Sequence, residues 1–364
     1  MTWTPSFFPR TLGIFGKRIE GDDCLMKLAQ QRFREAGMGP EIYAVTVEQL
    51  DWALQFRPAD DLPIVVHLAR NLDLAREDSR HQIVEFARRF AGRVEGLVVH
   101  DHRKLAENFQ DYLQAARELE SRLETIESCP RLFIEYAAGL EIDTFVTFFE
   151  SIHSLERISA CVDIGHVGIH QVRKAYAQIH PGTDVCALKS QPERISQAMP
   201  DIENAVATVM PTILAMLEGL GTGGKPIHFH LHDGHPLSTF SPFGVSDHLS
   251  FLAEIPLSFD HGGRRRTGLI FGASGLAKVV MKALQVFGPQ SVSFTLEIHE
   301  SADRLPLGDA ANLFSHWRDK ANAERMNDWL TVLTENHRLL CDAVKAAMSH
   351  HHLPNEPRSE ILKG

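Results

Sequence analysis

Acidic and imidazole side chains gather at the ends of several short apolar runs of this sequence. The chain holds 20 histidines against 37 lysines and arginines. A carboxylate that is buried beside such runs needs a counter-charge, which a divalent cation supplies. Two glutamates, an aspartate and an imidazole would form an oxygen and nitrogen ligand set suited to Mn²⁺, Co²⁺, Mg²⁺ or Zn²⁺. The residues concerned are His67, His100, Asp101, Glu135, Asp163, His166, His230, Asp233, Glu297 and His299.

The alternation within two of these runs indicates which side chains point inward. His228, His230 and His232 alternate with Phe229 and Leu231. Successive side chains of a strand point to opposite faces, so the apolar pair is expected to pack under helices while the three imidazoles share the other face. By the same alternation Glu297 faces away from Leu296 and Ile298, which places it with the imidazoles.

Eight such runs occur, and each is followed by a stretch with helical periodicity. This pattern predicts an α/β protein with a closed (β/α)8 TIM barrel, whose chemistry lies at the C-terminal ends of the strands. An open doubly wound sheet is the second choice, because no GxGxxG follows the first run. The eight predicted strands are Thr11–Gly16, Glu41–Thr46, Ile64–Ala69, Gly96–Asp101, Arg131–Ala137, Ile158–Asp163, Pro226–His232 and Ser291–His299.

The spacing of the strands predicts two long insertions, at about 168–224 after strand six and 236–268 after strand seven. Loops of this length in a barrel usually lie at the active face. The first insertion holds a predicted helix, 201–218, and other helical patterns cover 23–36, 104–126 and 274–287. Residues 309–348 form a long C-terminal helical segment. We expect one barrel domain over 1–348 and a flexible tail over 349–364.

The composition indicates which partners and which cellular compartment to expect. The net charge of −10 disfavours broad nucleic-acid binding, which needs a positive surface. Five scattered cysteines without a CxxC pair indicate a reducing compartment and no zinc–thiolate site. We find no run of 18 apolar residues and no signal-peptide layout in the first ten residues, so a cytoplasmic protein without a membrane partner is expected.

From Ile64 to Glu300 the chain resembles the xylose-isomerase-like TIM barrel superfamily, which includes sugar isomerases, ketose 3-epimerases and endonuclease IV. The resemblance lies in Ile134-Glu135 with the following Tyr-Ala-Ala-Gly, in the Asp-x-x-His of 163–166, in the His-x-x-Asp of 230–233, and in Glu297. It implies four metal ligands, a proton-transfer role for the two glutamates, and a substrate-contacting or supporting role for His166. The implied ligands are Glu135, Asp163, His230 and Glu297.

Endonuclease IV-like members hold three zinc ions, and the resemblance to them adds further candidates. Their extra histidines correspond in position to His67 and His100. Their Asp-x-His after strand seven has only Ser246-Asp247-His248 as a counterpart, with the aspartate adjacent to the histidine. Additional metal or substrate-binding roles therefore fall on His67, His100, His232, Asp247 and His248, unless some of them only orient substrate hydroxyls or satisfy their own hydrogen bonds.

The leading function is a divalent-metal-dependent isomerase or epimerase of a sugar, or of a sugar-like polyol or keto acid. Glu135 and Glu297 would move the proton next to the carbonyl. Arg264 and Arg265 could hold a phosphate or carboxylate of the substrate, or belong to a solvated charge run. The alternatives are a di- or tri-zinc phosphoesterase of the endonuclease IV type and a non-catalytic binding barrel. The expected partner is a small carbohydrate-like molecule, with no nucleic acid, and the insertions are available for contacts in a homo-oligomer.

We predict that the protein does not act on DNA, because its charge is negative overall and no basic stripe with interleaved aromatic residues occurs along its predicted helices. Gel-shift and incision assays on abasic duplex at low salt check this. Robust incision that disappears in His67→Ala and His100→Ala variants would contradict the prediction and favour the three-zinc alternative.

Overall fold

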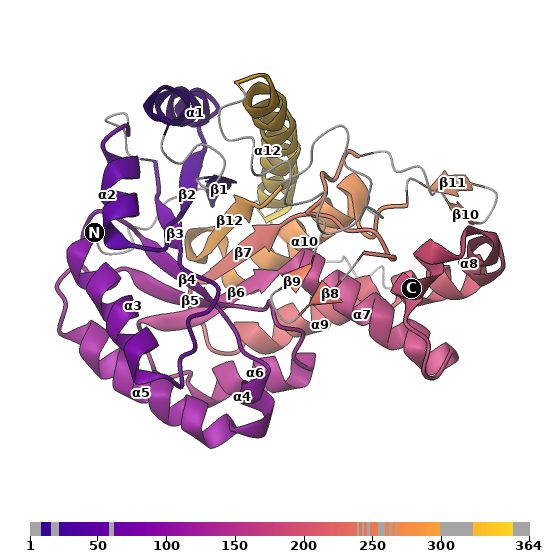
Figure 1. The fold of residues 1–364 in the computed structure, drawn as a ribbon, viewed down its shortest axis with the longest axis horizontal. Coiled ribbons are helices and arrows are strands. Elements are labelled where there is room, and N and C mark those ends of the chain that lie inside the picture. The colour runs from indigo at the N-terminus through magenta and orange to yellow at the C-terminus, as the bar shows by residue number, and fades with distance from the viewer. Residues whose placement is uncertain are drawn as a thin grey trace, which may run out of the picture.

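The computed structural model describes residues 9–15, 22–57, 62–238, 240–241, 244–245, 248–253, 259–261, 264–266, 268–298 and 323–351. Eight parallel strands close into a barrel in the order β1-β12-β7-β6-β5-β4-β3-β2, with helices around it (Figure 1). The predicted (β/α)8 barrel is confirmed. The barrel strands are β1 Arg10–Phe15, β2 Gly39–Tyr43, β3 Val65–His67, β4 Gly96–His100, β5 Arg131–Glu135, β6 Ile158–Asp163, β7 Ile227–Leu231 and β12 Val292–Leu296.

The helices of the outer ring carry their apolar side chains on the face toward the strands. Two predicted helical stretches are each divided in the structure. Asn108 separates α4 from α5 within 104–126, and Thr208 separates α8 from α9 in the first insertion. The helices are α1 Asp23–Glu35, α2 Val47–Leu54, α3 Glu77–Arg89, α4 Lys104–Glu107, α5 Phe109–Glu124, α6 Ile142–Ser151, α7 Ile164–Ile179, α8 Pro192–Ala207, α9 Val209–Gly221, α10 Gly272–Phe287 and α12 Ala323–His351.

The insertions and the C-terminal segment lie where the spacing predicted them. The first insertion consists of most of α7, the 3₁₀ helix η1 Val185–Ser190, α8 and α9. The second contains two short antiparallel pairs, β8 Phe240–Ser241 with β9 Gly244–Val245, and β10 Phe259–His261 with β11 Arg264–Arg266. The predicted helix over 309–348 is observed from Ala323 onward and continues to His351, while 309–322 and 352–364 lie outside the described residues.

The stretch Glu193–Gly221 is long and apolar enough to cross a membrane by length and composition alone. In the structure it consists of α8 and α9. Its side chains Ile202, Ile213 and Leu217 are buried in the hydrophobic core that the barrel shares with its helices. In all, 28% of its most apolar window is buried in the structure.

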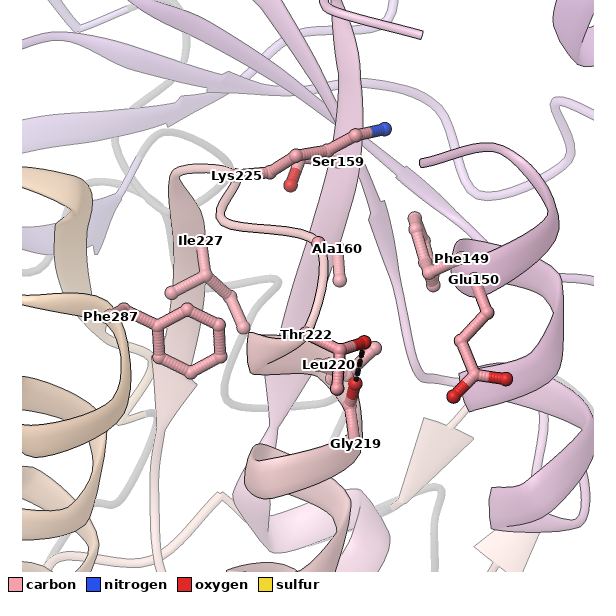
Figure 2. Close-up of a pocket in the computed structure, with 11 residues that line it drawn as sticks. Phe149, Glu150, Ser159, Ala160, Gly219, Leu220, Thr222, Lys225, Ile227 and Phe287 are labelled. Carbon is pink, nitrogen blue, oxygen red and sulfur yellow. Dashed lines mark hydrogen bonds between the residues drawn. The ribbon is translucent and has the colours of Figure 1, made fainter. Parts of the chain in front are cut away.

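A small pocket lies at the N-terminal ends of β6 and β7, where Ser159 and Ile227 line it (Figure 2). Its volume is about 20 Å³. Lys225 beside it donates hydrogen bonds to the carbonyls of Ile152 and Ile158 at 2.7 and 3.0 Å. The ammonium group thus serves to join chain segments at this end, opposite the strand ends that carry the imidazoles and carboxylates.

Asp233, two residues past β7, ties together the loops at the C-terminal end of the barrel. Its carboxylate accepts backbone N–H groups of Gly234, Ile270, Phe271 and Gly272 at 2.6–3.1 Å. The aspartate of the predicted His-x-x-Asp motif therefore holds the loop that leads into α10.

The segment 248–253 is fixed from two sides. Its Leu249 exchanges backbone hydrogen bonds with Asp233 at 2.8 and 2.9 Å. Asn336 of α12 accepts from the N–H of Phe251 at 3.1 Å and donates to the Ser250 hydroxyl at 2.9 Å. The C-terminal helix thereby positions the loop that carries His248.

We expect Asp233→Ala to lower the free energy of unfolding by roughly 3–5 kcal/mol, because four N–H groups lose a buried charged acceptor. Chemical denaturation of the full chain measures the loss. Asp78→Ala is the control, since Asp78 pairs with Arg76 on the exposed surface and its removal should change little. Equal stability of the two variants would contradict the structural role of Asp233.

Candidate metal centre

Four neighbouring strands bring the implied metal ligands together. Glu135 and Asp163 end β5 and β6, His230 lies in β7, and Glu297 follows β12 directly. None is more than 5% exposed. One ligand atom from each lies within 4.8 Å of the others, so the structure brings all four into one set. Their roles as ligands remain a prediction.

A second set forms on the side of β3 and β4. The Nε2 atoms of His67 and His100 lie 3.1 and 3.3 Å from Oε2 of Glu135. Ligand atoms of these three residues also fall within 4.8 Å of one another. The strand ends thus bring both histidines to the same carboxylate, and their roles remain a prediction.

A third set lies on the side of β7 and the following loop. It comprises Asp163, His166, His232 and His248, again within 4.8 Å. Nε2 of His232 is 2.9 Å from Oδ1 of Asp163, and the rings of His232 and His248 are 4.2 Å apart. Asp247, which the sequence suggested for this position, lies outside the described residues, and Asp163 supplies the carboxylate of this set.

Two carboxylates link the three sets. Oε2 of Glu135 faces His67 and His100, whereas its Oε1 faces Nδ1 of His230 at 3.5 Å. Oδ1 of Asp163 faces His232, and its Oδ2 lies 3.6 Å from Nε2 of His166. Glu135 therefore offers one oxygen to each of two neighbouring sets, as bridging ligands of multinuclear sites do. Both oxygens of Asp163 face histidines of the third set, and Asp163 links the sets because it also belongs to the first.

The chemistry of the donor atoms fits divalent cations. Among the described residues, Nδ1 of His230, Nε2 of His232 and Oδ2 of Asp163 are buried without a hydrogen-bond partner. Yet Nδ1 of His230 lies 2.9 Å from Oε2 of Glu297. Close contacts that are not aligned as hydrogen bonds are expected where several lone pairs point at a common position. Nitrogen and carboxylate donors of this kind suit Mn²⁺, Co²⁺, Mg²⁺ or Zn²⁺.

The electrostatics of the cluster favour a bound cation. Burial lowers the pKa of His100 to about 3, which keeps its imidazole in the neutral form that binds metal. Burial also opposes protonation of His230, but Cys161 and the carboxylates of Glu41, Glu135 and Glu297 raise its pKa well above the ordinary value. The carboxylates thus draw a positive charge into the cluster, which a proton or a metal ion can provide.

Helix α7 begins inside the site and shapes its third set. Asp163 caps the helix, with Oδ1 accepting the N–H of His166 at 2.8 Å. A Cβ atom on Gly165 would lie 2.0 Å from Cε1 of His232. The glycine of Asp163–His166 is therefore required for the close approach of the imidazole to α7.

The sequence interpretation missed Glu41, whose fully buried carboxylate contacts His228 and His230. The only available signal was a charged residue at the first position of the second predicted strand. Arg264 and Arg265 were expected in a loop. Their backbone instead forms β11, paired with β10, and their side chains lie outside the described residues.

The fold and the site define a (β/α)8 barrel with nine buried histidines and carboxylates at one end, in sets that could hold metal ions. No family model matches the chain, and no curated protein matches it.

Solved structures with a similar fold come from enzymes. The carboxyl transferase domain of Rhizobium etli pyruvate carboxylase with pyruvate shares 12% identity over 94% of this chain, with a TM-score of 0.39. This chain spans about half of that protein's length, 49%. The endo-1,4-beta-mannanase of Rhizomucor miehei shares 9% identity, with 88% of this chain and 96% of that chain covered and a TM-score of 0.45. The endo-beta-1,4-mannanase of Thermotoga petrophila also has 9% identity and a TM-score of 0.45, with 93% and 78% covered. Similarity at this level concerns the barrel and carries no argument about activity.

We predict that the purified protein binds more than one equivalent of Zn²⁺ or Mn²⁺, since the linked sets offer separate groups of donors. Chelator should lower its thermal midpoint by several degrees, because an ion at 100 times its Kd stabilises the native state by roughly 2.7 kcal/mol. Elemental analysis after dialysis and thermal scans check both expectations.

The double variant His67→Ala/His100→Ala should lose about one equivalent and keep the rest. His180→Asn serves as the control, because His180 pairs with Asp201 away from these sets. Metal-free protein with an unchanged thermal midpoint in chelator would overturn the metal centre.

Proposed function

We propose that this protein is a multinuclear metal-dependent hydrolase of a small phosphoester, in a barrel of the xylose-isomerase-like type. The observation that supports it most is the position of the Glu135 carboxylate between two sets of imidazoles. On sequence grounds a zinc phosphoesterase is the alternative to the isomerase or epimerase, and we prefer the phosphoesterase because of this carboxylate.

Proton transfer by Glu135 would require a free oxygen. A glutamate that binds one metal ion and also acts as a base needs its second oxygen directed at the substrate. Here Oε2 of Glu135 lies within 3.3 Å of Nε2 atoms of both His67 and His100. Both oxygens are therefore occupied within the cluster, as suits a bridging ligand.

Divalent cations in such a site lower the pKa of water and neutralise charge on a phosphoryl oxygen. The residues of this chain would hold such ions in place, and three of them keep a small exposed area. His100 and His248 are each 8% exposed and Glu297 is 5%, whereas Asp163, His230 and His232 have no exposed surface. We infer that the substrate approaches over His100, His248 and Glu297.

Arg70 is the cation that we assign to the anionic part of the substrate. It follows His67 by three residues, is partly exposed, and acts electrostatically on both His100 and the Tyr43 hydroxyl. The Tyr43 ring stacks on His67 with centroids 5.1 Å apart. The Arg70 side chain hydrogen-bonds the Tyr43 hydroxyl, and we propose that the remaining donors of its guanidinium bind a phosphate.

A sugar isomerase or epimerase is the second candidate. The set of Glu135, Asp163, His230 and Glu297 is the one that the family resemblance implies for those enzymes, and the structure brings its ligand atoms within 4.8 Å. In that function His67 and His100 would orient substrate hydroxyls, and Glu297 would be the base. We further propose a cytoplasmic setting with a small-molecule substrate, in keeping with five cysteines that form no disulfide.

The two functions predict different activities for one preparation loaded with Zn²⁺ or Mn²⁺. We expect hydrolysis of p-nitrophenyl phosphate or bis(p-nitrophenyl) phosphate and no wash-out of deuterium from the carbon next to the carbonyl of keto-sugars. Glu135→Gln should reduce the rate of hydrolysis on the order of 10²-fold or more. Loss of a residue that only hydrogen-bonds a metal ligand already lowers metal affinity or activity roughly 10–100-fold.

Arg70→Gln should mainly raise KM, and His180→Asn should leave hydrolysis unchanged. Deuterium wash-out that stops in Glu297→Gln, together with no phosphoester hydrolysis, would overturn the hydrolase and establish the isomerase or epimerase.

A further inference from the structure

Glu41 lies inside the barrel on the far side of His230 from the proposed metal ligands. It belongs to β2, is fully buried, and its side chain crosses the barrel interior toward β7 and β12. Oε1 contacts Nε2 of His230 at 2.8 Å. Oε2 contacts Nε2 of His228 at 3.0 Å and accepts the Thr295 hydroxyl at 2.5 Å.

The hydrogen-bonding capacity of these groups determines where the protons lie. An ionised carboxylate only accepts hydrogen bonds, so His230, His228 and Thr295 must all donate to Glu41. A metal ion at the cluster would take the place of the second proton that the carboxylates draw to His230, and the one proton left on the ring then lies on Nε2, against Glu41. Nδ1 keeps its lone pair, and it is Nδ1 that lies 2.9 Å from Glu297 and 3.5 Å from Glu135.

The side chains that surround Glu41 support the same placement of the protons. With its proton on Nε2, His228 must accept at Nδ1, where the Ser293 hydroxyl lies 2.6 Å away and can donate. His228, Ser293 and Thr295 are buried, so these bonds are shielded from water. The hydrogen-bonding groups of Glu41 and of these three side chains then have consistent roles as donors or acceptors.

We propose that Glu41 is a positioning residue that fixes the tautomer and ring orientation of His230, so that Nδ1 is presented to the metal centre. The proposal rests on the proposed metal-dependent function. A carboxylate that accepts the second N–H of a ligating histidine sets the ring in place and raises the basicity of the coordinating nitrogen. Glu41 also lies with His67 and His230 in a group whose ligand atoms are within 4.8 Å of one another. Both its oxygens already accept hydrogen bonds from side chains, which favours the positioning role over a ligand role.

Two variants separate positioning from general packing. Glu41→Gln keeps the shape but offers one acceptor and one donor, so it cannot accept from both imidazoles. We expect its affinity for Co²⁺ or Zn²⁺ to fall roughly 10–100-fold. Thr295→Val removes one donor to the same carboxylate without touching His230, and its affinity should stay within about threefold of wild type. Thermal unfolding of both metal-free variants reports any general damage.

The tautomer is read directly by ¹⁵N NMR of ring-labelled histidine in the zinc-loaded wild type, with His230 assigned from a His230→Asn variant. A proton on Nε2 and a coordinated Nδ1 are expected. A proton on Nδ1 would overturn the proposal, and this measurement does not depend on the Glu41 variant folding. Glu41→Gln binding metal as tightly as Thr295→Val would overturn it as well.

The outcome also separates this inference from the proposed function. If the wild type binds no divalent metal, the metal-dependent function fails and the positioning role falls with it. If the wild type binds metal and Glu41→Gln binds it equally well, only the role of Glu41 is wrong.

Discussion

The structure depends on the cost of removing carboxylates from water. Glu41, Glu135, Asp163 and Glu297 are all buried at one end or in the interior of the barrel. An isolated buried carboxylate is strongly unfavourable unless opposite charge or several hydrogen-bond donors surround it. Here the donors are imidazoles, which each carry one proton when neutral and a lone pair that needs a hydrogen-bond donor, a proton or a metal ion. The concentration of histidines in this chain follows from that requirement.

The strands and most of the site could be predicted because both depend on local patterns. Short runs of six to nine mostly apolar residues locate the strands, and a parallel barrel forces their C-terminal ends to one face. That is why Glu135, Asp163 and Glu297 meet although they lie far apart in the sequence. Alternation along β7 likewise placed His228, His230 and His232 inside. Their burial in the structure agrees with that reasoning.

What the sequence could not show depends on contacts across the barrel. Glu41 meets His230 over a separation of 189 residues, and nothing near Glu41 distinguishes it from a charged residue at a strand entrance. The division of the chemistry among three linked sets was equally hidden, because it depends on which oxygen of Glu135 faces which strand. The sequence does not reveal the helix breaks at Asn108 and Thr208, because the apolar periodicity continues through both.

The contacts of Asn336 have a consequence for how the chain reaches its working form. Asn336 belongs to the last described helix, and its amide holds the segment that carries His248. A domain generally folds as a unit, and α12 is the last described helix of this one. Without α12 the segment that carries His248 keeps its backbone pairing with Asp233 but loses the amide that fixes Phe251 and Ser250. A chain that ends before residue 336 would therefore hold this segment from one side only, and the third set would be the first of the donor sets to lose its geometry.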